Sequence, residues 1–142
     1  MKERELYPPI FQLFSDYVFH EEVGVGHRSR TTKTIDLVGL PIGITHDTEL
    51  ISIEVKISDW KKVFRQALDN LFYVNLSYVA LPEKCVSKVD LTVFESEGVG
   101  VVSVNGVAKE ILPACHSTLV RTPKRNCIIE TCMKRGVHVP HA

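Results

Sequence analysis

The pattern of hydrophobic and polar positions predicts a helix at the N-terminus followed by strands. Near the N-terminus, apolar residues recur three or four positions apart, as they do along one face of an amphipathic helix. They are Leu6, Ile10, Leu13, Phe14 and Tyr17. Pro8 and Pro9 are compatible with this helix because proline is tolerated in a first turn. Strands are expected next over 18–26 and 35–40.

The third expected strand has the clearest pattern in the chain. Its apolar positions are Ile51, Ile53, Val55 and Ile57, and they alternate with Ser52, Glu54, Lys56 and Ser58. Successive side chains of a strand point to opposite faces, so the alternation predicts a half-buried strand with one polar face. Turn-forming residues over 41–47 indicate an antiparallel hairpin with the preceding strand.

Helical spacing resumes after Ser58 and Asp59, either of which can cap a helix N-terminus. The apolar stripe consists of Trp60, Val63, Phe64, Ala67, Leu68, Leu71 and Phe72. A strand over 76–81 then ends at Pro82. A helix between these strands is long enough for a right-handed crossover, which predicts that the two strands are parallel.

The rest of the chain predicts an amphipathic segment over 86–94, strands over 98–104 and 107–112, and a terminal helix over 128–134. An Asn-Gly pair at 105–106 indicates a tight hairpin between the last two strands. The expected order is therefore αβββαβ, followed by a C-terminal β-hairpin and tail. This order predicts one α/β domain over 1–142, with a mixed sheet flanked by helices.

Composition is that of one globular domain, with 44% hydrophobic and 24% charged residues. No apolar run approaches the roughly 18 residues that cross a bilayer, and the charged N-terminus is unlike a signal peptide. We therefore expect a cytoplasmic protein that does not enter membranes. Because 17 basic side chains balance 17 acidic ones, any nucleic-acid binding must come from local clusters. The candidate clusters are Arg28-Ser29-Arg30 with Lys33, Lys61-Lys62 with Arg65, and Arg121 with Lys124-Arg125, although such clusters are more often solvated surface.

Four cysteines, Cys85, Cys115, Cys127 and Cys132, are expected to be reduced because no secretory signal accompanies them. Three of them, with His116, can be assembled on paper into a zinc site. The spacing lacks the paired C-x2-4-C knuckles typical of zinc sites, so free cysteines are favoured.

Candidate chemistry is concentrated on the second and third strands. Glu54 and Lys56 are two apart and so share a face, and hairpin pairing can bring Asp36 opposite them. Two carboxylates, with the backbone carbonyl of Val55, form the oxygen-rich site that Mg²⁺ or Mn²⁺ prefers. Such a metal activates water and polarises a phosphoryl oxygen, while Lys56 can orient the water or offset charge. The alternative is a solvent-facing Glu and Lys with an unrelated Asp, because so short a pattern also occurs by chance.

The wider sequence favours the first interpretation by resemblance. Ile35-Asp36-Leu37, a 17-residue gap and Ile53-Glu54-Val55-Lys56 resemble the D-x(n)-ExK signature of the PD-(D/E)xK nuclease superfamily. The segment Glu5-Leu6-Tyr7-Pro8-Pro9 resembles the N-terminal motif of its small prokaryotic branches. The helix with Gln66, and then Tyr78-Val79-Ala80-Leu81-Pro82, resembles the segment that follows ExK. The resemblance covers about 3–105 and leaves 106–142 as an extension.

This resemblance implies a restriction-endonuclease-like αβββαβ core that cleaves phosphodiesters with Mg²⁺ or Mn²⁺. It implies that Asp36 and Glu54 are metal ligands, that Lys56 is catalytic, and that Glu5 and Gln66 approach the site from the first helix and the crossover helix. One departure concerns the Q-x3-Y pattern of many members. Asn70 occupies the tyrosine position here, and Tyr73 follows three residues later. Gln66 and Tyr73 would share one line of a helix, where each could equally be an ordinary edge residue.

The leading hypothesis is a metal-dependent nuclease with DNA as the favoured substrate, although the sequence does not distinguish DNA from RNA. The alternative from another class is a catalytically silent nucleic-acid-binding or regulatory module with the same fold. A structural subunit of a larger complex is a third hypothesis. So small a domain has little surface for gripping a duplex, which suggests a homodimer.

Overall fold

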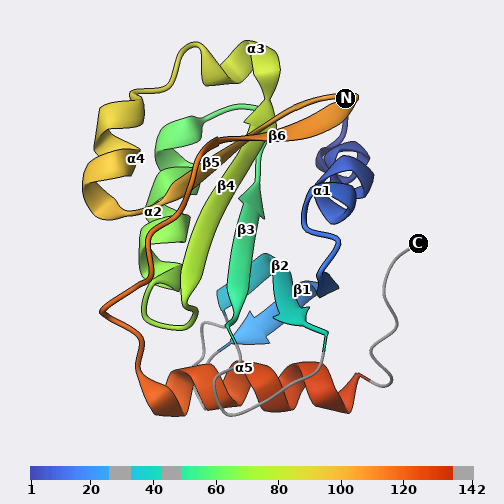
Figure 1. The fold of residues 1–142 in the computed structure, drawn as a ribbon, viewed down its shortest axis with the longest axis vertical. Helices are drawn as coiled ribbons and strands as arrows, with labels where there is room; N and C mark the ends of the chain where they lie inside the picture. The colour runs from blue at the N-terminus through green and yellow to red at the C-terminus, as the bar shows by residue number, and fades with distance from the viewer. Residues whose placement is uncertain (26–32, 43–48, 136–142) are drawn as a thin grey trace.

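A mixed sheet of six strands forms the centre of the protein, with the order β1-β2-β3-β4-β5-β6 (Figure 1). The structure is a computed structural model that describes residues 1–25, 33–42 and 49–135. The strands are β1 (Tyr17–Val25), β2 (Lys33–Pro41), β3 (Ile51–Val55), β4 (Leu76–Pro82), β5 (Gly100–Asn105) and β6 (Val107–Leu112). The helices are the 3₁₀ turn η1 (Glu3–Leu6), α1 (Tyr7–Leu13), α2 (Trp60–Asn70), α3 (Glu83–Val86), α4 (Leu91–Glu97) and α5 (Thr122–Lys134).

The pairing of the strands confirms the expected mixed sheet. β1, β2 and β3 are antiparallel neighbours, β3, β4 and β5 are parallel, and β6 returns antiparallel to β5. As expected, α2 crosses over between the parallel strands β3 and β4, and the side chain of Asp59 caps its N-terminus by accepting from the Lys62 amide. Gly106, with φ of 73°, makes the tight turn between β5 and β6 that the Asn-Gly pair predicted.

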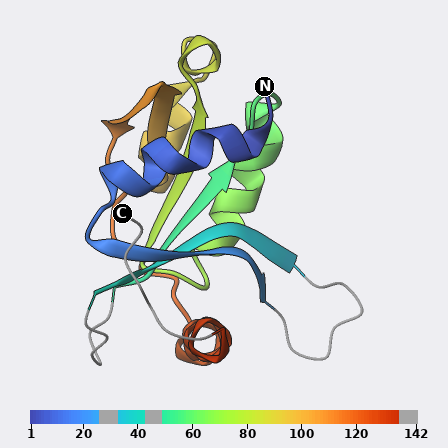
Figure 2. The ribbon, with the colours of Figure 1, turned by 90° about the vertical axis from the view of Figure 1, so that its right-hand side faces the viewer.

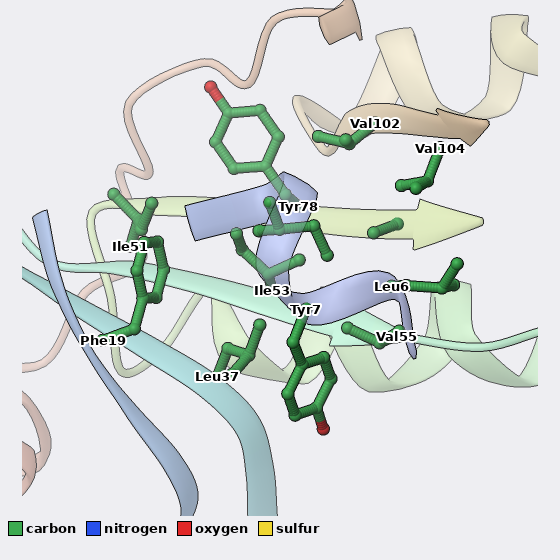
Figure 3. Close-up of a cluster of buried hydrophobic side chains, with 12 residues drawn as sticks. Leu6, Tyr7, Phe19, Leu37, Ile51, Ile53, Val55, Tyr78, Val102 and Val104 are labelled. Carbon is green, nitrogen blue, oxygen red and sulfur yellow. The ribbon is translucent and has the colours of Figure 1, made fainter. Parts of the chain in front are cut away.

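The prediction that β3 is half-buried was wrong, because all five of its residues are buried. α1 covers one face of the sheet and α2 the other (Figure 2). A core cluster lies beneath α1 and contains Leu6 and Tyr7 (Figure 3). The β3 residues in this cluster are Ile51, Ile53 and Val55. The polar face of β3 is covered instead by α2. This cover places Ser52 and Glu54 in the interior, where hydrogen bonds must satisfy them.

Both terminal helices differ from the expected bounds. α1 ends at Leu13, so Phe14 and Tyr17 lie outside the helix although they continue its apolar spacing. Phe14 packs edge-on against Tyr78 of β4, with ring centroids 5.2 Å apart, and this tertiary contact uses the apolar side chain without a helix. α5 begins at Thr122, six residues before the expected start, with a proline in its first turn.

α5 lies across one end of the sheet (Figures 1 and 2). Its buried residues Ile128 and Cys132 join a cluster with Val23 and Val25 of β1. The four cysteines are free thiols, as expected. The turn predicted over 41–47 falls largely within 43–48, which lies outside the described residues. The basic cluster Arg28-Ser29-Arg30 also lies outside them. In the described ranges, no helix is long and apolar enough to cross a membrane.

Candidate active site

The register between β2 and β3 places Asp36 beside Glu54. The ladder pairs Gly39 with Ile51 and Leu37 with Ile53, and the next position in the same register is Asp36 with Glu54. Regular pairing stops there, and the Asp36 carboxylate itself takes over the next hydrogen bond. Its Oδ2 accepts from the Val55 amide at 2.8 Å. The two carboxylates therefore lie together at the point where β2 and β3 diverge.

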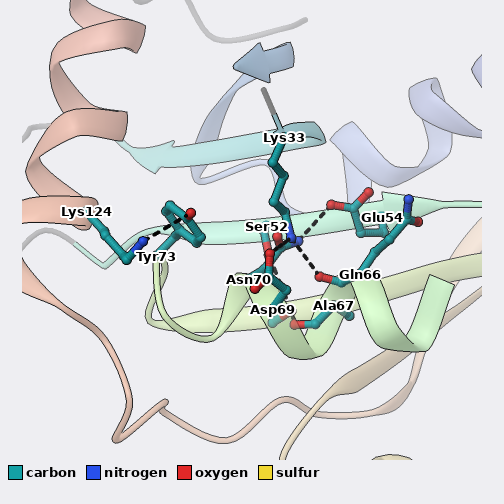
Figure 4. A network of polar contacts seen from close by, with 10 residues as sticks. Lys33, Ser52, Glu54, Gln66, Ala67, Asp69, Asn70, Tyr73 and Lys124 are labelled. Carbon is teal, nitrogen blue, oxygen red and sulfur yellow. Dashed lines mark hydrogen bonds and ion pairs between the residues drawn. The ribbon is translucent and has the colours of Figure 1, made fainter. Parts of the chain in front are cut away.

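Glu54 is oriented by Asn70, the last residue of α2. The Asn70 Nδ2 donates to Glu54 Oε2 at 2.7 Å, and both side chains are buried, with Glu54 only 1% exposed. Asn70 lies four positions after Gln66, one helical turn along the side of α2 that faces β3 (Figure 4). The sequence singled out Asn70 only as a departure from the family pattern. Its spacing from Gln66 was the signal that could have identified it as a partner of the carboxylates.

Burial raises the pKa of both carboxyl groups. Desolvation, reinforced by the negative charge of Asp36, raises the pKa of Glu54 to about 7. Desolvation also raises the pKa of Asp36, against the opposing effect of its hydrogen bond from Val55. Glu54 is buried, Asp36 is half-buried, and the two carboxyl groups hydrogen-bond each other. Such a pair resists simultaneous ionisation unless a cation balances it. The pair is therefore suited either to sharing a proton or to binding a metal ion.

Two lysines supply positive charge on either side of the pair. Lys56 follows β3 directly, and its Nζ lies 3.7 Å from Glu3 Oε2. Its charge acts on Asp36, opposing the rise in that carboxyl's pKa. Lys33, at the start of β2, acts in the same direction on the pKa of Glu54. The Lys33 Nζ is held 2.5 Å from Asp69 Oδ2 and donates to the Gln66 carbonyl at 3.2 Å (Figure 4).

The expectation that Glu5 approaches the carboxylate pair requires correction. Glu5 is exposed and lines a separate hollow with Pro82 of β4 and Gly106 of the β5–β6 turn. The acid that does reach the pair is Glu3, whose charge adds to the rise in the pKa of Asp36. The physical reason is the short 3₁₀ turn: burial of Leu6 fixes its rotation and directs Glu3, rather than Glu5, toward Lys56.

Gln66 and Tyr73, which were expected to share one line of the crossover helix, lie in different places. Gln66 is half-buried on the side of α2 that faces Glu54, and its Oε1 is buried with no hydrogen-bond partner among the described residues (Figure 4). Tyr73 does not continue its line, because α2 ends at Asn70 and the chain turns. The Tyr73 hydroxyl instead accepts from Lys124 of α5 at 3.3 Å.

The donor atoms present fit a divalent cation that prefers oxygen. Val55 holds one oxygen of Asp36 and Asn70 holds one oxygen of Glu54. The two carboxyl groups also hydrogen-bond each other, and a bound cation would replace that contact. In a strand the N–H and C=O of one residue point to the same side, so the Val55 carbonyl faces Asp36 as its amide does. Asp36, Glu54 and the Val55 carbonyl could together hold Mg²⁺ or Mn²⁺, with water completing the shell. No group of three His, Cys, Asp or Glu suited to a metal is present in the described segments, so neither the zinc site considered for the cysteines nor a third carboxylate ligand is found there.

Glu54→Gln is expected to stabilise the metal-free protein at pH 8 and to have little effect at pH 5. The folded-state pKa of Glu54, about 7, lies above its ordinary value of 4.5. The folded protein therefore loses stability as pH rises from about 4.5 to about 7, because a buried charge must then form. Glutamine carries no charge and can still accept from Asn70. Urea unfolding in EDTA should show a gain on the order of 1–3 kcal/mol at pH 8. An equal effect of the substitution at both pH values would contradict the buried-charge explanation.

The comparisons with known proteins support the fold alone. No protein-family model and no curated protein sequence matches the chain. Among solved structures, the fold is similar to the SPO1766 protein of unknown function from Silicibacter pomeroyi, with a TM-score of 0.69 and 14% identity. The similarity covers 95% of this chain and 86% of that one. At this identity the comparison supports a shared overall fold and nothing about function.

Proposed function

We propose that the protein is a metal-dependent phosphodiesterase that cleaves nucleic acid, with DNA as the favoured substrate and a PD-(D/E)xK type of site. The observation that carries this proposal is the meeting of Asp36 and Glu54 at the fork between β2 and β3, with Lys56 directly after β3. A protein that buried two carboxylates together for stability alone would incur the desolvation that raises both pKa values. A cation offsets that cost and gives the arrangement a function.

Each residue has a separate role in the proposed reaction. A bound Mg²⁺ or Mn²⁺ supplies positive charge that polarises a phosphoryl oxygen and lowers the pKa of water. Asp36 and Glu54 would bind that ion, and Asn70 and the Val55 amide hold their carboxylates in place. Lys56 positions the attacking water and balances charge on the phosphoryl group as the P–O bond breaks. The Glu3 carboxylate contacts the Lys56 ammonium and keeps that ammonium near the site.

Cleavage should require the divalent ion. Purified protein would be incubated with single-stranded, duplex and branched DNA and with RNA, in Mg²⁺, Mn²⁺, Ca²⁺ or EDTA. We expect cleavage of at least one substrate in Mg²⁺ or Mn²⁺ and none in EDTA, because the carboxylate pair alone repels the phosphate. The Glu54→Gln protein, which keeps the hydrogen bond from Asn70, is the matched control for a contaminating nuclease. Cleavage that persists in EDTA or in this variant would refute the proposal.

One observation favours the catalytically silent alternative as a second candidate. The third acid implied by the family pattern, Glu5, lies away from the carboxylate pair, so the acidic set is smaller than the resemblance implies. A module that binds nucleic acid without cutting it would cleave none of the tested substrates. Its affinity for each substrate that it recognises would be the same in Mg²⁺ as in EDTA. The same panel therefore separates the two functions.

A further inference from the structure

A strip of basic and aromatic side chains connects the carboxylate pair to α5. It consists of Lys33, Phe72, Tyr73, Arg121 and Lys124. The Lys124 Nζ lies over the Tyr73 ring, 4.7 Å from its centroid, and the Lys33 Nζ lies 5.9 Å from the same centroid. The Arg121 guanidinium lies over the Phe72 ring at 5.3 Å. Each ring thus fixes a cation that would otherwise move freely in solvent.

Lys33 connects this strip to the proposed active site. Its charge acts on Glu54, its Nζ contacts Asp69 and the Gln66 carbonyl, and it also lies near the Tyr73 ring. Figure 4 shows the resulting row of side chains, from Glu54 through Lys33 to Tyr73 and Lys124. Arg121 and Lys124 lie in the 106–142 extension, which the family resemblance does not cover. The backbone fixes their position, because the Arg121 amide donates to the Phe72 carbonyl at 3.0 Å.

The strip surrounds a hollow of about 160 Å³ that is lined by Asp69, Phe72, Tyr73, Arg121 and Lys124. The lining contains one acid, Asp69, and that carboxylate already forms an ion pair with Lys33. Within the described part of the chain, Arg121 and Lys124 form no ion pair with a carboxylate. Two cations held on aromatic faces around a small hollow suit an anionic ligand.

We infer that this strip binds the backbone of a single-stranded arm of the nucleic acid whose adjoining phosphate lies at Asp36 and Glu54. The part of this inference that concerns cleavage rests on the proposed function, while the binding part does not. A polynucleotide offers successive phosphates, which suit the two cations that form no ion pair within the described residues, Arg121 and Lys124. Lys33 lies between them and Glu54. The neutral net charge of the chain makes such a local set the source of affinity.

A single strand fits the strip better than a duplex. The hollow is small, and its walls carry two aromatic rings that are half-buried and partly accessible. Bases of an unpaired strand can stack on aromatic side chains and on guanidinium planes, whereas those of a duplex are already stacked on one another. The predicted substrate is therefore a nucleic acid in which an unpaired arm adjoins the scissile phosphate.

The test compares two charge-matched double variants. Arg121→Gln with Lys124→Gln removes two cations of the strip. Lys84→Gln with Lys88→Gln removes two exposed lysines in and beside α3, at the opposite end of the molecule from α5 (Figure 1). Fluorescence anisotropy in Ca²⁺ would measure binding of a labelled single strand, a blunt duplex, and a duplex with an unpaired arm of about eight nucleotides. Arg121→Lys with Lys124→Arg keeps both charges, and thermal unfolding of each variant checks that its substitutions leave the fold intact.

The strip variant is Arg121→Gln with Lys124→Gln, and the α3 variant is Lys84→Gln with Lys88→Gln. We expect the strip variant to bind the single strand and the armed duplex (the duplex with an unpaired arm) about tenfold more weakly than the wild-type protein does. Its slope of log affinity against log salt should fall by about 1.4, which corresponds to two phosphate contacts of about 0.7 each. The α3 variant and the charge-conserving variant should bind like the wild-type protein. In single-turnover assays with Mg²⁺, the strip variant should cut the armed duplex more slowly at limiting protein but at the wild-type rate at saturation, because the strip does not touch the reacting atoms.

Several outcomes would overturn the inference. Equal losses in the strip variant and the α3 variant would show that only bulk charge matters. An equal loss on the blunt duplex would refute the preference for a single strand, and a wild-type protein that binds no nucleic acid would refute the strip altogether. If the wild-type protein binds through the strip but cuts nothing, the proposed function fails while this inference stands.

Discussion

Replacing Lys56 by alanine is expected to lower the single-turnover rate of cleavage by on the order of 10²-fold or more, while metal binding is retained. An ammonium cannot be a ligand for a cation, so Mn²⁺ affinity should change little. The Lys56 Nζ lies 3.7 Å from Glu3 and its charge acts on Asp36, which places it beside the proposed metal site. Its loss removes positioning and charge stabilisation from the transition state. The measurement is cleavage in Mg²⁺ alongside binding in Ca²⁺.

Two further variants make this result specific to Lys56. Lys56→Arg keeps the charge but should rescue cleavage poorly, because a planar guanidinium is bulkier and essentially never deprotonates. Lys84→Ala, which removes an exposed lysine of α3, should cut normally. Nucleic-acid affinity should fall only slightly in Lys56→Ala, since one lysine contributes a single phosphate contact. Wild-type cleavage by Lys56→Ala would show that the proposed mechanism is wrong.

Removing either carboxylate of the pair is expected to abolish specific divalent-metal binding. Asp36→Asn can still accept from the Val55 amide, and Glu54→Gln can still accept from Asn70, so both proteins should fold. Each substitution removes a charged oxygen ligand, and the loss of Mn²⁺ affinity should be at least on the order of 10²-fold, since even partners outside the ligand set are worth tenfold or more. Isothermal titration calorimetry with Mn²⁺ measures this directly.

Glu5→Gln is the matched control, because Glu5 is an exposed acid that lines a different hollow. Its Mn²⁺ affinity should equal that of the wild-type protein. Thermal unfolding gives a second measurement: Mn²⁺ should raise the melting temperature of the wild-type protein and of Glu5→Gln, and of neither variant at the pair. If Asp36→Asn and Glu54→Gln both bind Mn²⁺ as tightly as the wild-type protein, the metal site does not exist.

Local periodicity in the sequence was sufficient to determine the elements around the site. The alternation over 51–57 identified β3, and the stripe beginning at Trp60 identified α2. The sequence left Ser58 or Asp59 as the cap of α2, and the structure shows that it is Asp59. The length of the α2 segment predicted parallel strands on either side, which the pairing of β3 with β4 confirms. These features depend on interactions within a few residues, or on the simple geometry of a crossover, and so they can be read from one sequence.

The composition of the candidate site was only partly determined in this way. Strand parity and a hairpin were enough to predict that Asp36 lies beside Glu54. The register of β2 and β3, extended by one position, places the two residues opposite each other, and the hydrogen bond from Val55 to Asp36 agrees with this. The burial of Glu54 was not foreseen, because alternation identifies two faces but does not say whether a helix covers the polar one. In the structure α2 covers that face, and the buried Glu54 requires Asn70 as its donor.

Tertiary packing alone decided the remaining features. A short 3₁₀ turn, rotated by the burial of Leu6, brings Glu3 rather than Glu5 to Lys56. The docking of α5 on the sheet places Lys124 over Tyr73, two residues that lie 51 positions apart in the sequence. No local pattern encodes such a meeting, because it depends on which apolar surfaces are left for Ile128 and Cys132 of α5 to cover once the sheet has formed.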